Sequence, residues 1–167
     1  MKNDFTDSEY FDAAYFLAYN AHKGQTDLAG KPYFEHPKRV AAKFNSYIYK
    51  TIAILHDVLE DTWITEEMLR KMFPKEIVNA VVFLTRKKDE SYKEYIDRMC
   101  NSLYVIDDSD YYAREVKIAD LEDNMDLTRL EEITDEDLNR VKKYSKWRKV
   151  LMEKQEHVNE LIKKGLS

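Results

Sequence analysis

Four ionisable side chains stand close together in an otherwise apolar stretch, residues 53–62, where a helix is expected. They are His56, Asp57, Glu60 and Asp61. Residues four apart face similar directions on a helix, so these groups can converge on one polar pocket. Burying two carboxylates side by side raises a pKa sharply unless a cation neutralises them, so a bound metal ion is one interpretation. A solvated helix end, where acidic residues are common, is the other.

Two residues elsewhere in the chain extend this pattern. Asp120 stands in a second apolar segment, residues 116–125, at a position where a core helix ordinarily carries an apolar residue. His36 directly precedes a proline at an expected helix entrance, where capping is the alternative to metal binding. Imidazoles and carboxylates together suit Mn²⁺, Fe²⁺ or Zn²⁺ rather than a metal bound by thiolates. The candidate metal ligands are His36, His56, Asp57 and Asp120.

Helices are expected to position these residues. Apolar residues recur at three- and four-residue spacing, and only 3 Gly and 3 Pro interrupt the chain. The run 77–84 is rich in β-branched residues, but no second strand candidate exists to pair with it. We therefore predict an all-α, single-domain helical bundle over residues 1–167. The expected helices are 8–23, with Asp7 or Ser8 as N-cap, and 37–45, 46–59, 65–72, 74–84, 91–99, 111–126 and 135–164.

Composition limits the classes of function. The length of 167 residues suits one domain, and 44% hydrophobic with 35% charged residues is a globular balance. The net charge of −5 argues against a protein that coats nucleic acid. The single cysteine, Cys100, excludes an internal disulfide and favours a reducing compartment, so we expect the cytoplasm. The start of the chain lacks a long apolar region and no stretch approaches the roughly 18 apolar residues of a membrane span, so no membrane association or processing is expected.

Three motifs follow one another along the chain: GQTDLAGKPYFEHP at residues 24–37, His56-Asp57 with Glu60-Asp61-Thr62, and Lys117-Ile-Ala-Asp120 with Asn124. Their order and spacing, over about residues 13–130, resemble the HD-domain hydrolases of RelA/SpoT-type alarmone enzymes. The resemblance implies an HD-type all-α fold and one divalent metal ion, usually Mn²⁺, held by the four candidate ligands. It also implies that Glu60 and Asp61 handle the attacking water. The length matches the hydrolase alone, because synthetase and regulatory domains need several hundred more residues.

The remaining histidines bear on the number of metal ions. Binuclear members of the wider family use additional histidines, and only His22 and His157 are left. His157 lies among charged residues of the last helix, where a solvated face is expected. His22, at the end of the first helix, suits either the pocket or a capping role. One metal ion is therefore predicted.

An anionic nucleotide also needs positive charge from the protein. Candidates are Lys23, Lys31, Arg86, Lys87, Lys117, Arg140 and Arg148, with solvated surface positions as the alternative. Asn124 shares a helix face with Asp120 and resembles the family asparagine that faces the nucleotide. Tyr144 and Arg148 share a face where a ring can stack on a base beside a phosphate-binding cation, although inward packing of the ring is the alternative. The predicted substrate-binding residues are Lys23, Asn124, Tyr144 and Arg148.

The chain departs from the family at four positions. Asp27 and Leu28 replace basic residues in the loop before the first motif histidine, and Leu121 and Asp126 replace basic residues around the last metal aspartate. Fewer cations weaken binding of a highly charged alarmone more than they affect the metal site. We predict a metal-dependent nucleotide phosphohydrolase, with guanosine 3′,5′-bis(diphosphate) 3′-pyrophosphohydrolysis as the first activity. A nucleotidase or phosphodiesterase of other specificity, and a non-catalytic nucleotide-binding module, are the alternatives; the Glu60-Asp61 pair speaks against the module.

Overall fold

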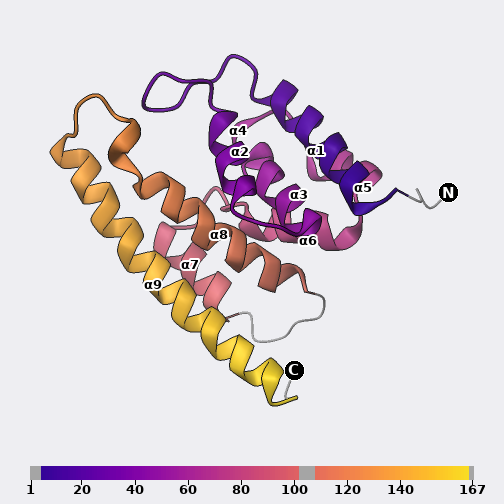
Figure 1. The fold of residues 1–167 in the computed structure, drawn as a ribbon. Helices are drawn as coiled ribbons and strands as arrows, with labels where there is room; N and C mark the ends of the chain where they lie inside the picture. Colours follow the sequence, from indigo (N-terminus) through magenta and orange to yellow (C-terminus); the bar gives the residue numbers. More distant parts are fainter. Residues whose placement is uncertain (1–4, 102–107, 166–167) are drawn as a thin grey trace.

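The computed structural model describes residues 5–101 and 108–165, and this part of the chain is helical without a strand (Figure 1). The prediction of an all-α fold is confirmed. One isolated bridge, between Thr26 and Pro32, closes the long loop after the first helix. The helices are α1 (Asp7–Ala21), α2 (Glu35–Ala42), α3 (Tyr47–Leu55), α4 (Val58–Asp61), α5 (Glu66–Met72), α6 (Lys75–Leu84), α7 (Tyr92–Asn101), α8 (Ser109–Met125), the 3-10 turn η1 (Leu127–Arg129) and α9 (Asp135–Lys163).

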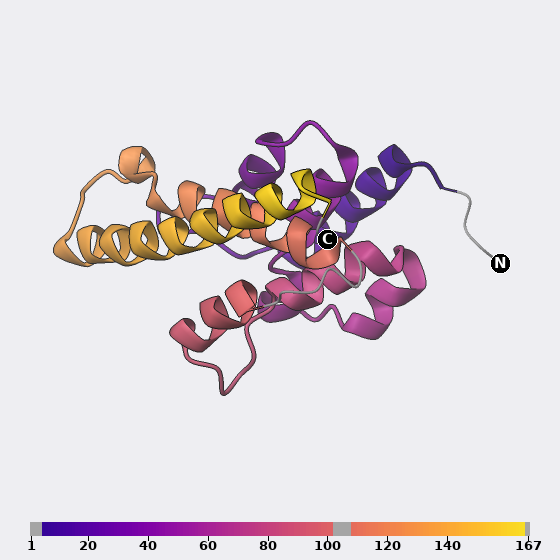
Figure 2. The same cartoon turned by 90° about the horizontal axis from the view of Figure 1, so that it is seen from below.

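Helix α8 occupies the middle of the arrangement. It packs against α2, α3 and α6 on one side and along α9 on the other. Figure 1 shows α9 as a long rod on the outer side of α8, and Figure 2 shows the same layer from below. Helix α8 therefore lies between the α2–α3 region and α9.

Helix α3 is the most deeply buried element, because Thr51 to Leu55 are all almost fully removed from solvent. Its neighbours contribute the other core side chains, among them Ala14 and Ala18 of α1, Val78 and Val81 of α6, and Val116 and Leu121 of α8. Burial of this apolar surface is the main favourable contribution to folding. The same packing fixes the end of α3 in the interior, where His56 follows.

The predicted continuous helix 46–59 is wrong, since α3 ends at Leu55 and α4 begins at Val58. His56 Nδ1 donates to Ala53 O at 2.7 Å, the carbonyl to which a continuous helix would bond the Asp57 N–H. Asp57 O then accepts from the N–H of Glu60 and of Asp61, at 3.2 and 3.0 Å, and starts the short α4. The helix break turns His56 and Asp57 toward the same point.

Helices α7 and α9 begin with a capping box, and α1 is capped at a residue other than the expected one. Ser91 with Glu94, and Thr134 with Asp137, exchange the hydrogen bonds of a capping box. Helix α1, by contrast, is capped by Thr6 with Glu9, rather than by Asp7 or Ser8. Helix α2 begins at Glu35, two residues before the expected start, and α9 ends within one residue of the expected 164.

None of the described helices has both the length and the apolar character that a membrane span needs. Residues 1–4, which belong to the segment used to predict that the chain is not processed, lie outside the described residues. The single-domain division over residues 1–167 stays a prediction.

Candidate metal centre and adjoining pocket

The four candidate metal ligands come together from three separate parts of the fold: α2, the junction between α3 and α4, and α8. His36 Nε2 lies 3.1 Å from Asp120 Oδ1 and 3.7 Å from Asp57 Oδ2. His56 Nε2 lies 3.0 Å from Asp57 Oδ2 and 3.6 Å from Asp120 Oδ1. Two imidazole nitrogens and two carboxylate oxygens thus converge on one point. We call these four residues the ligand cluster.

The opposite nitrogen of each histidine ring is fixed by a second contact. His36 Nδ1 bonds Asp123 Oδ2 at 2.7 Å, and His56 Nδ1 donates to Ala53 O at 2.7 Å. A donating Nδ1–H leaves Nε2 with the lone pair that a metal ion requires. His56 Nε2 is buried and has no hydrogen-bond partner among the described residues. The donor set and this unbonded nitrogen fit a divalent ion.

Charge within the ligand cluster is strongly coupled. Burial alone would raise the pKa of Asp120, but the Lys117 ammonium group and the two imidazoles hold it well below its ordinary value. Lys117 Nζ lies 2.7 Å from Asp120 Oδ2. Burial alone would lower the pKa of His56, and the neighbouring carboxylates raise it well above its ordinary value. The carboxylates therefore favour positive charge at this point, which a divalent cation also supplies.

Two further side chains complete the surroundings of the carboxylates. The Tyr33 hydroxyl donates to Asp57 Oδ2 at 2.5 Å, and Asn124 Nδ2 donates to Asp120 Oδ1 at 2.5 Å. The His22 ring packs on Tyr33 with centroids 5.0 Å apart and is buried at the end of α1. His22 is thus both the C-cap residue of α1 and a neighbour of this group of side chains.

Glu60 and Asp61 lie on α4, next to Asp57, and both residues are exposed. Partial shielding of the carboxylate from water raises the pKa of Glu60 above its ordinary 4.5. A hydrogen bond from the Arg86 N–H, at 2.5 Å, lowers this pKa but does not outweigh the shielding. Partial shielding and the charge of Asp57 likewise raise the pKa of Asp61 above its ordinary 3.8. Carboxylates with raised pKa values are suited to accepting a proton.

The loop that holds Glu60 is itself anchored. Arg98 of α7 donates to Phe83 O at 2.9 Å and Thr85 O at 3.2 Å, and pairs with Glu90 at 2.7 Å. These contacts fix both ends of the segment that carries the Arg86 N–H. Glu60 is therefore positioned through the backbone of a neighbouring loop rather than by a side chain.

The structure separates the predicted substrate-binding residues. Asn124 joins the ligand cluster, whereas Lys23 is exposed after the end of α1. Tyr144 is half-buried and packs toward Tyr92, with ring centroids 6.1 Å apart. Arg148 pairs with Glu122, with Nε 2.9 Å from Oε1. Only one of the four predicted positions lies directly beside the ligand cluster.

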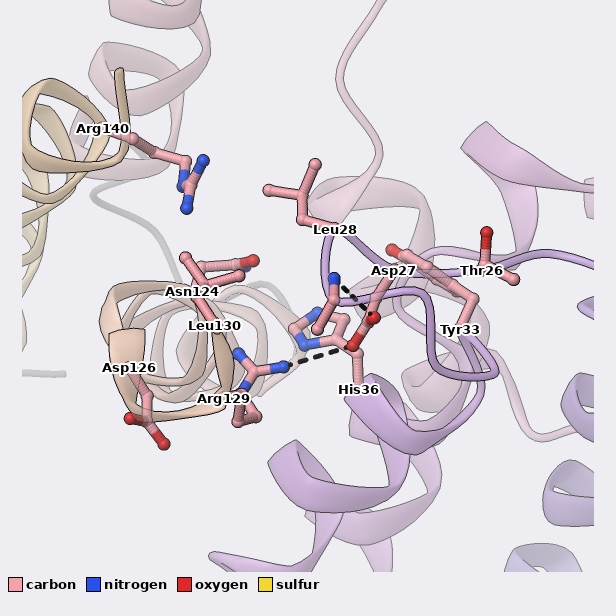
Figure 3. Close-up of a pocket in the computed structure, with 11 residues that line it drawn as sticks. Thr26, Asp27, Leu28, Tyr33, His36, Asn124, Asp126, Arg129, Leu130 and Arg140 are labelled. Atoms are coloured by element: carbon pink, nitrogen blue, oxygen red, sulfur yellow. Dashed lines mark hydrogen bonds and ion pairs between the residues drawn. The ribbon is translucent and has the colours of Figure 1, made fainter. Parts of the chain in front are cut away.

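A pocket of about 270 Å³ adjoins the ligand cluster (Figure 3). It shares His36 with the cluster and is also lined by Tyr33 and Asn124, which bond the cluster's carboxylates. Three of the four family departures line it or its rim, namely Asp27, Leu28 and Asp126, whereas Leu121 is buried in the core. Arg140 reaches the pocket from α9. The other lining residues are Thr26, Ala29, Arg129 and Leu130.

Sequence reasoning missed three residues that matter here. Asp123 is 5% exposed and bonds His36, and its i+3 spacing from Asp120 was a usable signal. Tyr33 precedes His36 by three residues in the first motif, which was a second signal. Arg129 follows α8 within η1, and nothing in the sequence marks it as a pocket residue.

Comparison with known proteins agrees with this arrangement. No protein-family model matches the chain. It is 34% identical over 119 residues to the bifunctional (p)ppGpp synthase/hydrolase SpoT of Escherichia coli, a match that covers 67% of this chain and 17% of the relative. It is 36% identical over 90 residues to a probable guanosine-3′,5′-bis(diphosphate) 3′-pyrophosphohydrolase of Mycoplasma genitalium, covering 52% of this chain and 12% of the relative. The chain thus spans less than a fifth of the length of these relatives.

A solved structure described as a metazoan orthologue of SpoT that hydrolyses ppGpp has the same fold. The TM-score is 0.67 at 24% sequence identity, over 95% of this chain and 97% of that one. The chain therefore shares the all-helical fold of that structure. Its sequence relatives are SpoT and the ppGpp 3′-pyrophosphohydrolases, which confirms the resemblance predicted from the motifs.

Proposed function

We propose that this chain is a metal-dependent phosphohydrolase that removes the 3′-diphosphate from guanosine 3′,5′-bis(diphosphate). The observation that carries the proposal is the convergence of two imidazole nitrogens and two carboxylate oxygens beside a pocket and beside the carboxylates of Glu60 and Asp61. The activities by which the relatives in Escherichia coli and Mycoplasma genitalium are named support the choice of first substrate.

We assign the ligand cluster to one divalent ion, with Mn²⁺ first and Fe²⁺ or Zn²⁺ as alternatives, because mixed nitrogen and oxygen donors suit these metals. Such an ion, when bound, polarises a phosphoryl oxygen and lowers the pKa of water. Asp123 and the Ala53 carbonyl orient the two imidazoles for it, at 2.7 Å each. Tyr33 holds the Asp57 carboxylate through its Oδ2, the oxygen that also faces the two imidazoles, and Lys117 holds the Asp120 carboxylate through its other oxygen, Oδ2.

Glu60 and Asp61 are assigned to the attacking water. The water oxygen forms a bond to the 3′ phosphorus, the bond from that phosphorus to the ribose 3′ oxygen breaks, and diphosphate leaves. One water proton passes to the carboxylate of Glu60 or Asp61, whose raised pKa values favour acceptance. The ribose 3′ oxygen recovers a proton from the carboxylic acid so formed or from solvent, which completes the balance.

A nucleotidase or phosphodiesterase acting on a less charged nucleotide is the second candidate. The acidic residues Asp27 and Asp126 in the pocket favour it, since they oppose a polyanionic ligand. The partner in either case is a small-molecule nucleotide rather than nucleic acid, in keeping with the net charge of −5. Such a substrate is consistent with the cytoplasm, which we propose as the location.

The test is kcat/KM for guanosine 3′,5′-bis(diphosphate) against nucleoside mono-, di- and triphosphates, with Mn²⁺ present. The proposal expects the largest value for the bis(diphosphate), with diphosphate as the released product. A larger value for any simple nucleotide supports the second candidate and overturns the alarmone assignment. Absence of turnover on the whole panel, with metal bound, supports the non-catalytic binding module.

A further inference from the structure

An ion pair lies across the pocket next to the ligand cluster. Asp27, in the loop after α1, places Oδ2 3.4 Å from Arg129 Nη1, although the two residues are 102 positions apart in the chain. Figure 3 shows the Arg129 guanidinium and the Asp27 carboxylate joined by a dashed line. A ligand held at the ligand cluster that extends into the pocket meets both charges.

The Asp27 carboxylate is held firmly in place. Its Oδ1 accepts from the N–H of Ala29 and from the N–H of Lys31, both at 2.9 Å. The side chain is only 12% exposed. The turn of the loop therefore holds the Asp27 carboxylate in a fixed position facing Arg129. The carboxylate is a fixed negative charge of the pocket rather than a mobile surface charge.

The two arginines of the pocket are already engaged. Arg129 Nη2 donates to Asp123 O at 2.8 Å while Nη1 faces Asp27. Arg140 Nη2 lies 2.7 Å from Asp137 Oδ1. A phosphate group that reaches Arg129 must separate it from Asp27 and also tolerate the carboxylate's negative charge.

We propose that Asp27 is a specificity-determining residue that favours nucleotides with few phosphates on the end that is not hydrolysed. The inference rests on the proposed function, because it takes the reacting 3′-diphosphate to lie at the ligand cluster. The rest of the nucleotide then occupies the pocket, where the Asp27–Arg129 pair penalises each additional 5′-phosphate. The ligand class is a guanosine 3′-diphosphate with a short 5′ substituent.

The experiment uses three nucleotides that share the 3′-diphosphate and carry one, two or three 5′-phosphates. The inference expects kcat/KM of the Mn²⁺-loaded wild-type protein to fall along this series, by about 10-fold or more from one to three 5′-phosphates. Asp27→Asn keeps an oxygen for the Ala29 and Lys31 N–H groups and removes the charge. It is expected to raise kcat/KM for the 5′-triphosphate about 10-fold and to flatten the series.

Asp126→Asn is the matched comparison, because it removes one negative charge from the same pocket without releasing Arg129. The Asp126 carboxylate accepts from Thr128 instead, at 2.6 Å from its hydroxyl. The inference expects a smaller gain than for Asp27→Asn. Equal gains in the two variants, or equal kcat/KM for all three nucleotides in the wild type, would overturn it.

Binding constants separate this inference from the proposed function. Calorimetry with the same three nucleotides on Glu60→Gln protein, whose turnover is expected to be roughly 10²-fold slower, measures the order of affinities. If the wild type hydrolyses none of them, the proposed function fails; a fall in affinity with each 5′-phosphate then shows only that the pocket selects against added charge. Activity on all three with affinities that do not fall leaves the function standing and overturns the inference.

Discussion

The ligand cluster and the pocket beside it are built differently. The ligands of the cluster lie on helices or at the junction between two helices, and hydrogen bonds from partners such as Asp123 and Lys117 hold their side chains in the interior. In the pocket, much of the lining comes from the loop after α1 and the segment around η1, and acids neutralise the arginines. Under the proposed function, the chemistry belongs to the helical core and the selectivity to loops, which can change without disturbing the ligands.

The largest effect is expected from a substitution within the ligand cluster itself. Asp120→Asn removes a ligand oxygen's charge and leaves Lys117 buried without its ion-pair partner. We expect turnover to fall to background and the free energy of unfolding to fall by about 3–5 kcal/mol, as when one member of a buried pair is lost. Phosphate-release assays and urea unfolding measure the two effects. The double variant Lys117→Met/Asp120→Asn should recover stability without activity; equal instability in both variants would refute the assigned pairing.

Removing the proton acceptors should separate chemistry from metal binding. Glu60→Gln and Asp61→Asn are expected to lower kcat by roughly 10²-fold or more, the usual range for loss of a general base. Metal content by elemental analysis should stay unchanged, because neither residue is in the ligand cluster. Near wild-type kcat in both variants would mean that the carboxylates are structural and that water is activated without them.

A smaller effect is expected one contact away from the cluster. Asp123→Asn weakens the bond that orients His36, together with the ion pair to Arg39 at 2.9 Å. Loss of such an outer partner costs about 10- to 100-fold in metal affinity or activity. Calorimetric titration of metal-free protein measures the affinity, with Glu67→Gln on the exposed face of α5 as control. An unchanged affinity in Asp123→Asn would make the contact to His36 incidental.

The smallest expected effect is a shift in pH dependence. Glu60 and Asp61 accept a proton only when ionised, and partial shielding from water raises the pKa of each above 4.5 and 3.8, respectively. As pH falls through the raised values the carboxylates become protonated, so kcat should decline already above pH 4.5. A profile of kcat against pH, taken over the range in which the protein stays folded and metal-loaded, measures this decline at low pH. A midpoint at or below ordinary carboxyl values would contradict the assignment.

The same contrast describes what could be predicted from the sequence. The four residues of the ligand cluster could be predicted from the sequence, because each of them stands in a short motif on or beside an apolar helix. The helix break at His56-Asp57 could not be predicted, because it depends on a hydrogen bond from the His56 side chain to Ala53 O. The spacing of apolar residues carries no sign of such a bond. The placement of Arg129 against Asp27 depends on contact between segments 102 residues apart. Such contacts arise from tertiary packing and leave no local pattern.

The metal site is tested by titration of metal-free protein with Mn²⁺, followed by calorimetry and by thermal unfolding. We expect one tight ion per chain and a melting temperature that rises with Mn²⁺ concentration, since binding to the folded state alone stabilises it. His56→Ala protein should show neither effect. The proposed metal site is contradicted if the wild type has no tight site for Mn²⁺, Fe²⁺ or Zn²⁺, or if His56→Ala binds the ion equally well.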